Sequence, residues 1–286
     1  MLSADIISKL RYVETDGSED LALFPDFLIV GPQRTGTTWL HAHLRIHPQI
    51  FLSEPKELFF FSRLEAKGDP RFESSRLSWY LQFFEEPLWR RLAKSALCLR
   101  RSGELYRPII RGEATASYAA MENDLIDEVV TLNPEIKVIT MVRDPVERAW
   151  SHAKKDLVRK TGRSVEDVPA DEFKAFFRDD YQLRCAAYVD NHERWRTRLG
   201  TGNLFVGFFD DVAERPARFL HDAMTFLGVR SDDRYVSDDV GEQINPTSGT
   251  SIPEHYRTYL EALLAEHIAA LDGCYGRRRS VAAERE

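Results

Sequence analysis

Residues 27–46 constrain the fold more than any other part of the chain. They have the pattern of a buried strand, a loop bracketed by glycines and a helix. The apolar run at 27–30 predicts a buried parallel strand, and residues 37–46 predict a helix. The loop between them places Gly31 and Gly36 at the spacing of phosphate-binding loops, whose backbone N–H groups and helix N-terminus bind anions. We therefore expect an anionic nucleotide to bind here.

The loop differs from that of nucleoside triphosphatases in its cation. Thr37 and Thr38 occupy the positions where those proteins carry Lys followed by Ser or Thr, and the cation within the loop is Arg34. The lysine that reaches the β- and γ-phosphates of a triphosphate is therefore missing. A nucleotide kinase or triphosphatase is the weaker alternative for this reason.

Short apolar strands alternate with helical stretches along the rest of the chain. Further strands are predicted at residues 50–52, 109–111, 137–142 and 204–208. This alternation predicts an α/β fold, in which helices cover both faces of a central, P-loop-like parallel sheet. The chain shows no internal repeat or low-complexity linker, so we expect a polar lead-in at 1–25, a single domain at 26–275 and a flexible tail at 276–286.

Capping residues mark several helix boundaries. Asp144, followed by Pro145, predicts a helix N-cap. Ser251 and Glu254 have the spacing of a capping box before a helix that reaches about residue 271. The other expected elements are a short helix at 5–12, a surface loop at 162–171 and an amphipathic helix at 211–227.

Composition argues against several classes of function. The 286 residues carry a net charge of −7, whereas nucleic-acid binding needs a basic face. Cys98, Cys185 and Cys274 are widely spaced, so neither a disulfide framework nor a zinc site is expected. No signal peptide is visible, and no apolar run approaches the ~20 residues of a membrane span. These features predict a cytoplasmic protein, and they carry no information on its oligomeric state.

A second anion site is predicted where the strand at 137–142 ends. Arg143 follows this strand at its carboxyl end, where open α/β sheets bind their ligands. Ser151 lies two helical turns after Asp144 on the same face. Arg143 and Ser151 are thus expected to converge on one anion. In the alternative, Arg143 pairs with Asp144 or Glu147 and Ser151 faces solvent.

The two sites together resemble the cofactor motifs of the sulfotransferases that use 3′-phosphoadenosine 5′-phosphosulfate (PAPS). The resemblance rests on Gln33-Arg-Thr-Gly-Thr-Thr-Trp39 and Arg143-Asp-Pro-Val-Glu-Arg-Ala-Trp-Ser151. Segments at 56–61, 79–80 and 112–118 resemble the heparan-type branch, although Ala114 and Ala116 replace a Lys and a Pro. The resemblance spans about residues 26–272. It implies sulfuryl transfer from PAPS to a hydroxyl acceptor, with 3′-phosphoadenosine 5′-phosphate (PAP) as product and no metal required.

The resemblance also implies roles for individual residues. It places the 5′-phosphosulfate on the first loop and the 3′-phosphate on Arg143 and Ser151, with Arg34 stabilising the transferring group. The cofactor-binding residues expected on this basis are Arg34, Thr35, Gly36, Thr37, Thr38, Trp39, Arg143, Ser151, Gly249 and Thr250. For Trp39, a place in the core is as good an interpretation as stacking on adenine.

An alcohol acceptor needs a general base, and Glu57 is the candidate. It follows the predicted strand at 50–52 beside apolar residues, and an apolar surround makes a carboxylate a better proton acceptor by raising its pKa. In heparan-type relatives a Glu at this motif position is the base. The alternative is a solvated Glu57 paired with Lys56 or Arg63. Other candidates for the base are Glu54, Glu113, His41, His43, His47 and His152.

The acceptor is expected to be a small molecule, a lipid-like metabolite or a sugar. Substrate contacts are predicted for Lys56, Phe60, Glu113 and Tyr118. An acidic chain without a basic strip favours a small or lipid-like acceptor over a long sulfated polysaccharide. A non-catalytic nucleotide-binding protein would keep the loop without needing Glu57, and the sequence leaves this alternative open.

Overall fold

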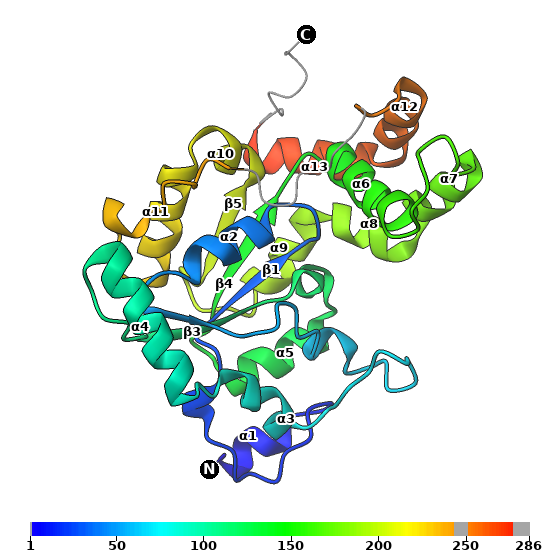
Figure 1. Cartoon of the computed structure of the whole chain (residues 1–286). Helices are drawn as coiled ribbons and strands as arrows, with labels where there is room; N and C mark the ends of the chain where they lie inside the picture. Colours follow the sequence, from blue (N-terminus) through cyan, green and yellow to red (C-terminus); the bar gives the residue numbers. More distant parts are fainter. Residues whose placement is uncertain (1, 243–250, 277–286) are drawn as a thin grey trace.

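The computed structural model describes residues 2–242 and 251–276, and they surround a five-stranded sheet (Figure 1). In chain order the strands are β1 (Phe27–Gly31), β2 (Ile50–Leu52), β3 (Ile110–Ala114), β4 (Lys137–Val142) and β5 (Leu204–Phe208). Their spatial order is β2-β3-β1-β4-β5, and every neighbouring pair runs parallel. The predicted parallel sheet is therefore confirmed, with β1 and the loop that follows it at its centre.

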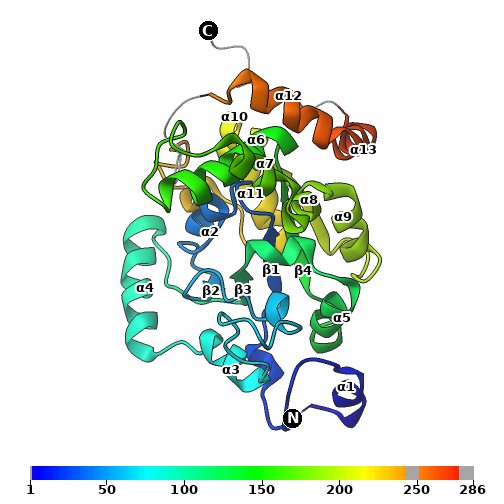
Figure 2. The ribbon, with the colours of Figure 1, turned by 90° about the vertical axis from the view of Figure 1, so that its right-hand side faces the viewer.

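Helices cover both faces of the sheet because side chains along each strand alternate between the faces. Phe27 and Ile29 of β1 belong to one apolar core, and Leu28 and Val30 belong to the other. The first core is covered by α2 (Thr37–Leu44), α10 (Phe209–Glu214) and α11 (Pro216–Leu227), and the second by α1 (Ala4–Lys9), α3 (Leu77–Leu81), α5 (Asn123–Leu132) and α9 (Tyr188–Arg196), as Figure 2 shows from the side.

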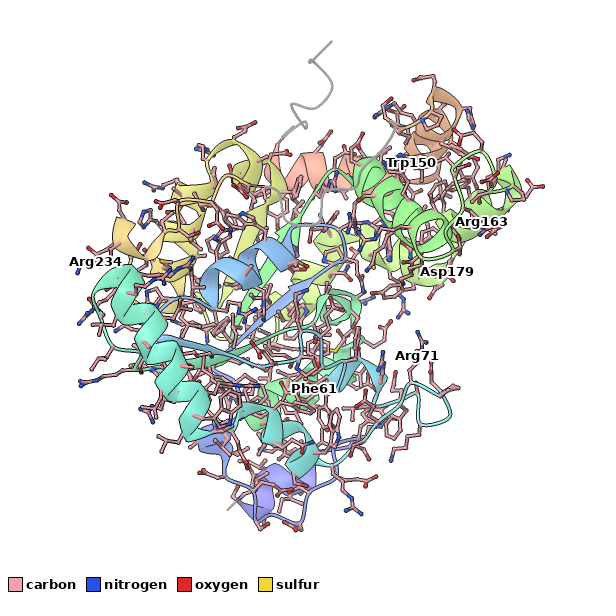
Figure 3. All side chains as sticks on the ribbon, in the orientation of Figure 1. Phe61, Arg71, Trp150, Arg163, Asp179 and Arg234 are labelled. Atoms are coloured by element: carbon pink, nitrogen blue, oxygen red, sulfur yellow. The ribbon has the colours of Figure 1, made fainter. Side chains whose placement is uncertain are left out.

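A third group of helices packs around Trp150, beside the sheet (Figure 3). Its members are α6 (Pro145–Ala153), the π-helical continuation of α6 (Lys154–Arg159), α7 (Ala170–Arg178), α8 (Asp180–Ala186) and α12 (Glu254–Leu263). The Trp150 ring stacks on Tyr256 of α12 and lies 5.3 Å from that of Phe173 in α7. This packing holds α6, which carries Ser151, against the rest of the domain.

The structure corrects several predicted helix boundaries. The helix expected at 211–227 is two helices, because Pro216 lacks the N–H that continuity needs and begins α11 instead. The helix expected to reach residue 271 ends at Leu263, since α12 packs on α6 whereas α13 (Ala265–Tyr275) packs on α9. The capping box at Ser251 does not form: Pro253 is the N-cap of α12, and no side chain caps this helix.

Other local predictions fare differently. The N-cap at Asp144 is confirmed, since its side chain accepts the N–H of Glu147 at 2.8 Å. β3 runs to Ala114, three residues beyond the predicted end, so Glu113 lies within a strand. Helix α4 (Leu88–Ser102) has no counterpart in the prediction. The short helix α1 ends at Lys9, earlier than expected, and the loop at 162–171 gives way to α7 at Ala170.

The residues expected as a polar lead-in are attached to the domain by Glu128 of α5. Its carboxylate accepts the backbone N–H groups of Arg11, Tyr12 and Val13, at 2.5, 3.2 and 2.9 Å. Phe24, just before β1, is buried in the core. Within 2–242 and 251–276, no helix combines the length and apolar character needed to cross a membrane.

Candidate active site

The loop after β1 has the backbone shape of an anion-binding loop. Arg34 and Gly36 adopt left-handed conformations, with φ of 72° and 96°, and α2 begins directly after Gly36, which has no side chain to cap the first turn. Successive N–H groups in such a loop and helix start form a concave site for an anion. Gly31 also has a positive φ, and a Cβ there would lie 2.4 Å from the carbonyl oxygen of Ala116. Both glycines are therefore needed for this shape.

The Thr35 side chain stabilises the loop through a hydrogen bond to the loop's own backbone. Its side chain is fully buried, and Oγ1 donates to the carbonyl oxygen of Pro32 at 2.6 Å. A hydroxyl group has one proton to donate, so this hydroxyl stabilises the loop instead of donating to a phosphate. The predicted cofactor contact of Thr35 therefore depends on its backbone N–H.

The two predicted anion sites meet in the structure. Arg34 Nε donates to Ser151 Oγ at 2.9 Å, and the Arg143 guanidinium donates to the Arg34 carbonyl oxygen at 3.1 Å. The same guanidinium lies over the Phe209 ring, 4.5 Å from its centroid. Strand β4 and helix α6 thus bring Arg143 and Ser151 to the loop after β1.

The carboxylates considered as alternative partners of Arg143 have other roles. Asp144 caps α6, and Glu147 Oε1 accepts a hydrogen bond from Arg257 of α12 at 2.7 Å. Burial lowers the pKa of Arg143, and the nearby charge of Glu147 opposes this shift. Arg143 and Ser151 are thus both bonded to Arg34, Ser151 is buried and does not face solvent, and the convergence of the two residues on one anion stays a prediction.

The π-helical segment adds cations that the sequence analysis does not identify. Burial lowers the pKa of Arg34, and the neighbouring charges of Arg143 and Arg159 lower it further. Burial also lowers the pKa of Lys155, and Arg34 is among the charges close to it. Lys155 and Arg159 follow Ser151 by four and eight residues, a spacing that keeps side chains on one helical face. That spacing is the signal by which sequence reasoning could have found them.

Lys56 connects the loop to the predicted base. Its ammonium nitrogen lies 3.4 Å from Thr38 Oγ1 and 3.2 Å from Glu57 Oε1. The Glu57 side chain is 21% exposed, so an acceptor entering from solvent can reach it. The ion pair between Glu57 and Lys56, which the alternative interpretation of Glu57 predicts, is thus present. This ion pair is compatible with a catalytic role because Lys56 also contacts Thr38 in the first turn of α2 and so holds Glu57 near the loop.

Glu54 is less suited to be a base. Its carboxylate lies 2.9 Å from an Arg45 nitrogen and 3.7 Å from an Arg90 nitrogen. Each of its two carboxylate oxygens thus has an arginine partner, which leaves less of the group for an acceptor hydroxyl. Glu57 differs from Glu54 in that its ion pair with Lys56 engages one oxygen, Oε1.

Glu113 lies beneath the segment that follows the predicted base, Glu57. Through Thr115 it holds the backbone of this segment in place. Thr115 Oγ1 donates to Glu113 Oε1 at 2.5 Å and accepts the N–H groups of Leu58 and Phe59, at 2.9 and 3.4 Å. Tyr80 OH donates to the other carboxylate oxygen. Phe59 has a φ of 57°, which is unfavourable for a bulky residue and persists where surrounding contacts impose it. The Thr115 hydroxyl supplies such a contact.

The burial of this network corrects the prediction that Phe60, Glu113 and Tyr118 contact the acceptor. They are 3%, 1% and 0% exposed, so their side chains are core residues under the site. Phe60 stacks on Tyr80 with ring centroids 4.7 Å apart, and Tyr118 OH accepts the N–H of Phe61 at 3.3 Å. Burial raises the pKa of Glu113 to about 7, and hydrogen bonds from neighbouring hydroxyls oppose the shift.

Trp39 is also a core residue. Its side chain is 5% exposed, its ring packs against His43 and Phe219, and its indole N–H donates to the carbonyl oxygen of Val240 at 3.0 Å. Little of the ring is left for a base to stack on. The structure therefore favours the core interpretation for this residue.

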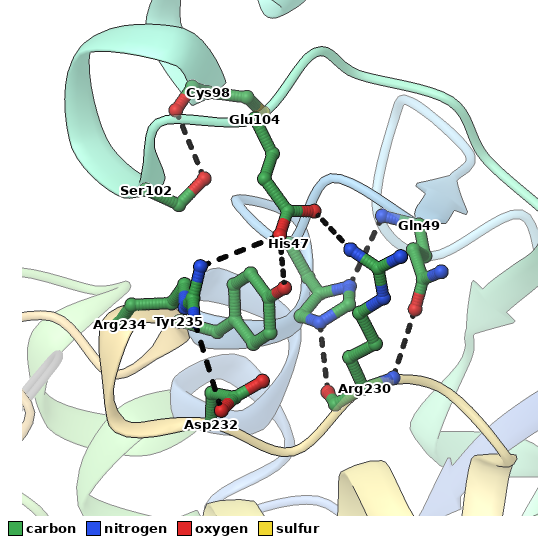
Figure 4. Close-up of polar contacts among 9 residues, drawn as sticks. All are labelled: His47, Gln49, Cys98, Ser102, Glu104, Arg230, Asp232, Arg234 and Tyr235. Carbon is green, nitrogen blue, oxygen red and sulfur yellow. Dashed lines mark hydrogen bonds and ion pairs between the residues drawn. The ribbon is translucent and has the colours of Figure 1, made fainter.

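The histidines considered as bases have structural surroundings. His41, His43, His47 and His152 are all buried, and burial lowers the pKa of each one. His47 Nδ1 accepts the N–H of Gln49 at 3.1 Å, and Nε2 lies 3.0 Å from the Arg230 carbonyl oxygen (Figure 4). His47 thus connects the segment after α2 with the segment after α11, and the burial of all four rings makes them less suited than Glu57 to meet an acceptor from solvent.

Two predicted contacts cannot be placed, since Gly249 and Thr250 lie outside the described residues. In the described part of the chain, no three His, Cys, Asp or Glu side chains form a group that could hold a metal ion.

Comparisons with known proteins point to one family. A model described as the sulfotransferase family matches residues 25–233. Human bifunctional heparan sulfate N-deacetylase/N-sulfotransferase 2 is 26% identical over 213 residues, covering 72% of this chain and 22% of that protein. Membrane-associated sulfotransferase kil1 of Dictyostelium discoideum is 31% identical over 131 residues, covering 46% of this chain and 23% of that protein. The chain thus spans less than a quarter of the length of either relative.

A solved structure has the same fold. The sulfotransferase from Alicyclobacillus acidocaldarius superimposes with a TM-score of 0.62, covering 91% of this chain and 99% of that one. The two sequences are 22% identical, so this likeness concerns the fold.

Proposed function

Because the chain belongs to the sulfotransferase family, whose model matches residues 25–233, we propose that it transfers a sulfuryl group from PAPS to a hydroxyl group of its acceptor. One observation carries the assignment of the site. Arg34 of the loop is hydrogen-bonded to Ser151 and to Arg143, so two motifs that are far apart in the sequence lie side by side, which supports one continuous donor site.

The donor fits this site through its two anionic ends. The N–H groups of the loop and of the first turn of α2 suit the 5′-phosphosulfate, because they form a concave, positively polarised site. Arg143 and Ser151 suit the 3′-phosphate. The Arg143 guanidinium, after the end of β4, is a charged hydrogen-bond donor, and the Ser151 hydroxyl, on α6, is a neutral one. Lys155 and Arg159 add positive charge close to Arg34.

In the transfer, a bond forms between the acceptor oxygen and sulfur while the bond between sulfur and the bridging phosphate oxygen breaks, and PAP leaves. As in phosphoryl transfer, the protein supplies position and charge stabilisation. Arg34 neutralises the negative charge that grows on the bridging oxygen. Glu57 accepts the proton of the acceptor hydroxyl.

The hydrogen bonds around Glu57 position its carboxylate relative to the loop. Glu113 and Thr115 hold the backbone of Leu58 and Phe59, directly after Glu57. Lys56 fixes its carboxylate relative to Thr38 of α2. Both contacts position the base relative to the loop, which is what an in-line displacement requires.

The kinase or triphosphatase alternative is not favoured. Such enzymes need a lysine in the loop and a carboxylate that holds Mg²⁺ near the end of a neighbouring strand. This chain has Thr37 at the lysine position, and Arg143 follows β4.

The acceptor class and location form a finer part of the proposal. We propose a small-molecule, lipid-like or sugar hydroxyl as the acceptor, with no nucleic-acid partner. The cysteines Cys98, Cys185 and Cys274 are all free, which fits a reducing compartment and hence the cytoplasm.

Calorimetric titration with PAP, and separately with ATP and magnesium, tests the nucleotide assignment. We expect PAP to bind much more tightly than ATP, and Arg143→Ala to weaken PAP binding roughly thirtyfold, since hydrogen bonds to charged groups contribute about 2 kcal/mol. Arg196→Ala is the matched control, because Arg196 is an exposed arginine paired with Glu193 on α9. Preference for ATP, or equal PAP affinity in the Arg143 and Arg196 variants, would overturn the proposal.

A further inference from the structure

Exposed apolar side chains are concentrated on one surface of the molecule, formed by residues 88–109 and here called the α4 surface. Among the described residues, eight large apolar side chains are exposed, and seven of them lie in this segment. They are Leu88, Trp89, Leu92, Leu97, Leu99, Leu105 and Ile109, with exposed fractions of 43% to 71%. Such a concentration marks an interaction site, whereas isolated exposed apolar residues are ordinary.

The most exposed of these side chains follow one line along α4. Leu88, Leu92 and Leu99 are four and seven residues apart, which places them on the same face of the helix, and Trp89 borders that face. Their exposed fractions are 71%, 61%, 53% and 65%. Figures 1 and 2 both show α4 at the outer edge of the molecule, with no helix or strand on its outer side. The apolar line is therefore open and convex.

The opposite side of α4 is firmly attached to the domain. Cys98 is buried, and the Lys94 ammonium lies 4.9 Å from the centroid of the Phe51 ring. Glu104, just after the helix, binds Arg230 at 2.7 Å and accepts the hydroxyl of Tyr235 at 2.9 Å (Figure 4). Because these contacts hold the inner side, α4 cannot rotate to bury its apolar line.

The α4 surface has the opposite charge to the chain as a whole. Residues 88–109 contain six cations and one acidic residue, Glu104. Lys94 lies on the inner side near Glu86, and Arg90 is paired with Glu54. The other four cations are exposed, and they are Arg91, Arg100, Arg101 and Arg107. The complete chain has a net charge of −7. Arg91 and Arg100 lie on either side of the apolar line and are both exposed. Positive charge therefore borders the apolar side chains.

We propose that the α4 surface binds the interface of an anionic lipid membrane. A helix with an apolar line bordered by arginine, and with an interfacial tryptophan, lies in the plane of such an interface with its apolar side chains inserted. The arginines are attracted to the negative surface potential of anionic lipids. This property is independent of the proposed sulfuryl transfer, and it concerns binding to one leaflet, not crossing it.

Other occupants suit the surface less well. A second copy of the chain, docked through α4, would bring two basic helices together and place like charges side by side. An anionic polysaccharide would use the arginines but would leave the leucines and Trp89 exposed to water. An acidic protein helix usually enters a groove, whereas this surface is a convex helix. A membrane interface uses both the charge and the apolar line.

Co-sedimentation with vesicles tests the proposal on the whole chain. Vesicles of phosphatidylcholine and phosphatidylserine in equal amounts should bind the protein, and vesicles of phosphatidylcholine alone should bind it much more weakly. Arg91→Glu with Arg100→Glu should reduce the affinity by at least twentyfold, because each cation near an anionic surface contributes roughly fivefold. Leu88→Ser with Leu92→Ser should also reduce the affinity. Ile7→Ser should not, because Ile7 is an exposed large apolar residue that lies outside the α4 surface.

Trp89 supplies a direct signal of insertion. It is 65% exposed, whereas Trp39, Trp150 and Trp195 are buried, so a blue shift in tryptophan fluorescence on adding anionic vesicles should disappear in Trp89→Phe. Near-ultraviolet circular dichroism and PAP titration of each variant show whether it is folded. Equal binding to both vesicle types would overturn the proposal. So would α4-dependent dimerisation without vesicle binding, or binding to heparin that survives the leucine substitutions while vesicle binding is absent.

Discussion

Arg34 and Ser151 are 117 residues apart in the chain, and their side chains are joined by a 2.9 Å hydrogen bond from Nε to Oγ. The arginine belongs to the loop after the central strand, and the serine belongs to a helix that a separate group of aromatic residues holds in place. The contact therefore couples the two halves of the proposed donor site. A substitution on the helix is expected to affect the loop as well.

Ser151→Ala should weaken PAP binding roughly tenfold, since it removes a hydroxyl from the proposed 3′-phosphate site and a partner of Arg34. Ser151→Thr keeps the hydroxyl and should lose less. Ser8→Ala, on the surface helix α1, is the control and should leave the affinity unchanged. Calorimetry on the three variants measures the difference, and an unaltered affinity in Ser151→Ala would mean that this hydroxyl contacts no phosphate.

Glu57→Gln should lower kcat by a factor on the order of 10²–10⁴, the usual contribution of a general base, while the affinity for PAP stays the same. Glu54→Gln is the matched control three residues away, and it should retain most of the turnover because its carboxylate is held by arginines. Steady-state kinetics with an accepted acceptor, together with PAP titration, separate the two effects. Equal losses in both variants would argue against Glu57 as the base.

The free energy of unfolding should depend on pH through Glu113. Burial raises the pKa of this carboxyl from 4.5 to about 7. Within that interval the folded protein holds a proton that the unfolded chain has released, so the contribution of Glu113 is present below about pH 4.5 and falls as the pH rises to about 7. Tyr80 and Tyr118, the titratable groups that face it, stay protonated there, because burial raises the pKa of both well above the ordinary value.

Denaturant unfolding of the wild type and of Glu113→Gln at about pH 5 and about pH 8 measures this contribution. The wild type should lose more stability between the two pH values than the variant does. The kcat of Glu113→Gln should also fall, with PAP affinity retained, because the carboxylate positions the backbone after Glu57 through Thr115. Identical pH dependence in both proteins would show that the carboxyl does not titrate in this interval.

Three glycine-to-alanine substitutions separate backbone strain from steric overlap. Gly31, Gly36 and Gly103 all have positive φ, which costs an alanine roughly 1–2 kcal/mol. At Gly103 an added Cβ meets nothing within 4 Å, at Gly36 it lies 3.2 Å from the Phe209 ring, and at Gly31 it lies 2.4 Å from a backbone oxygen. The loss of unfolding free energy should increase in that order. PAP affinity should fall in the Gly36 variant and remain in the Gly103 variant.

Much of the backbone of the proposed donor site could be predicted from the sequence because its features are local. The strand, the loop and the helix after it follow from apolar runs and glycine spacing. Asp144 and Pro145 mark the start of α6, and helical geometry then places Ser151 on a defined face. The location of Phe60 and Tyr118 could not be predicted in the same way, because aromatic side chains occur both in binding pockets and in apolar cores.

What the sequence determined by itself was the set of five strands, the strand–loop–helix unit around Gly31 and Gly36, and the family. Only the tertiary structure decided that Arg34 contacts Ser151, that Glu113 lies under the segment after the proposed base, and that the apolar line of α4 faces outward. The physical reason is that periodicity and capping depend on neighbours a few residues away. Contacts between distant segments depend on how whole layers pack, and an apolar helical face has the same pattern in the sequence whether it is covered or exposed.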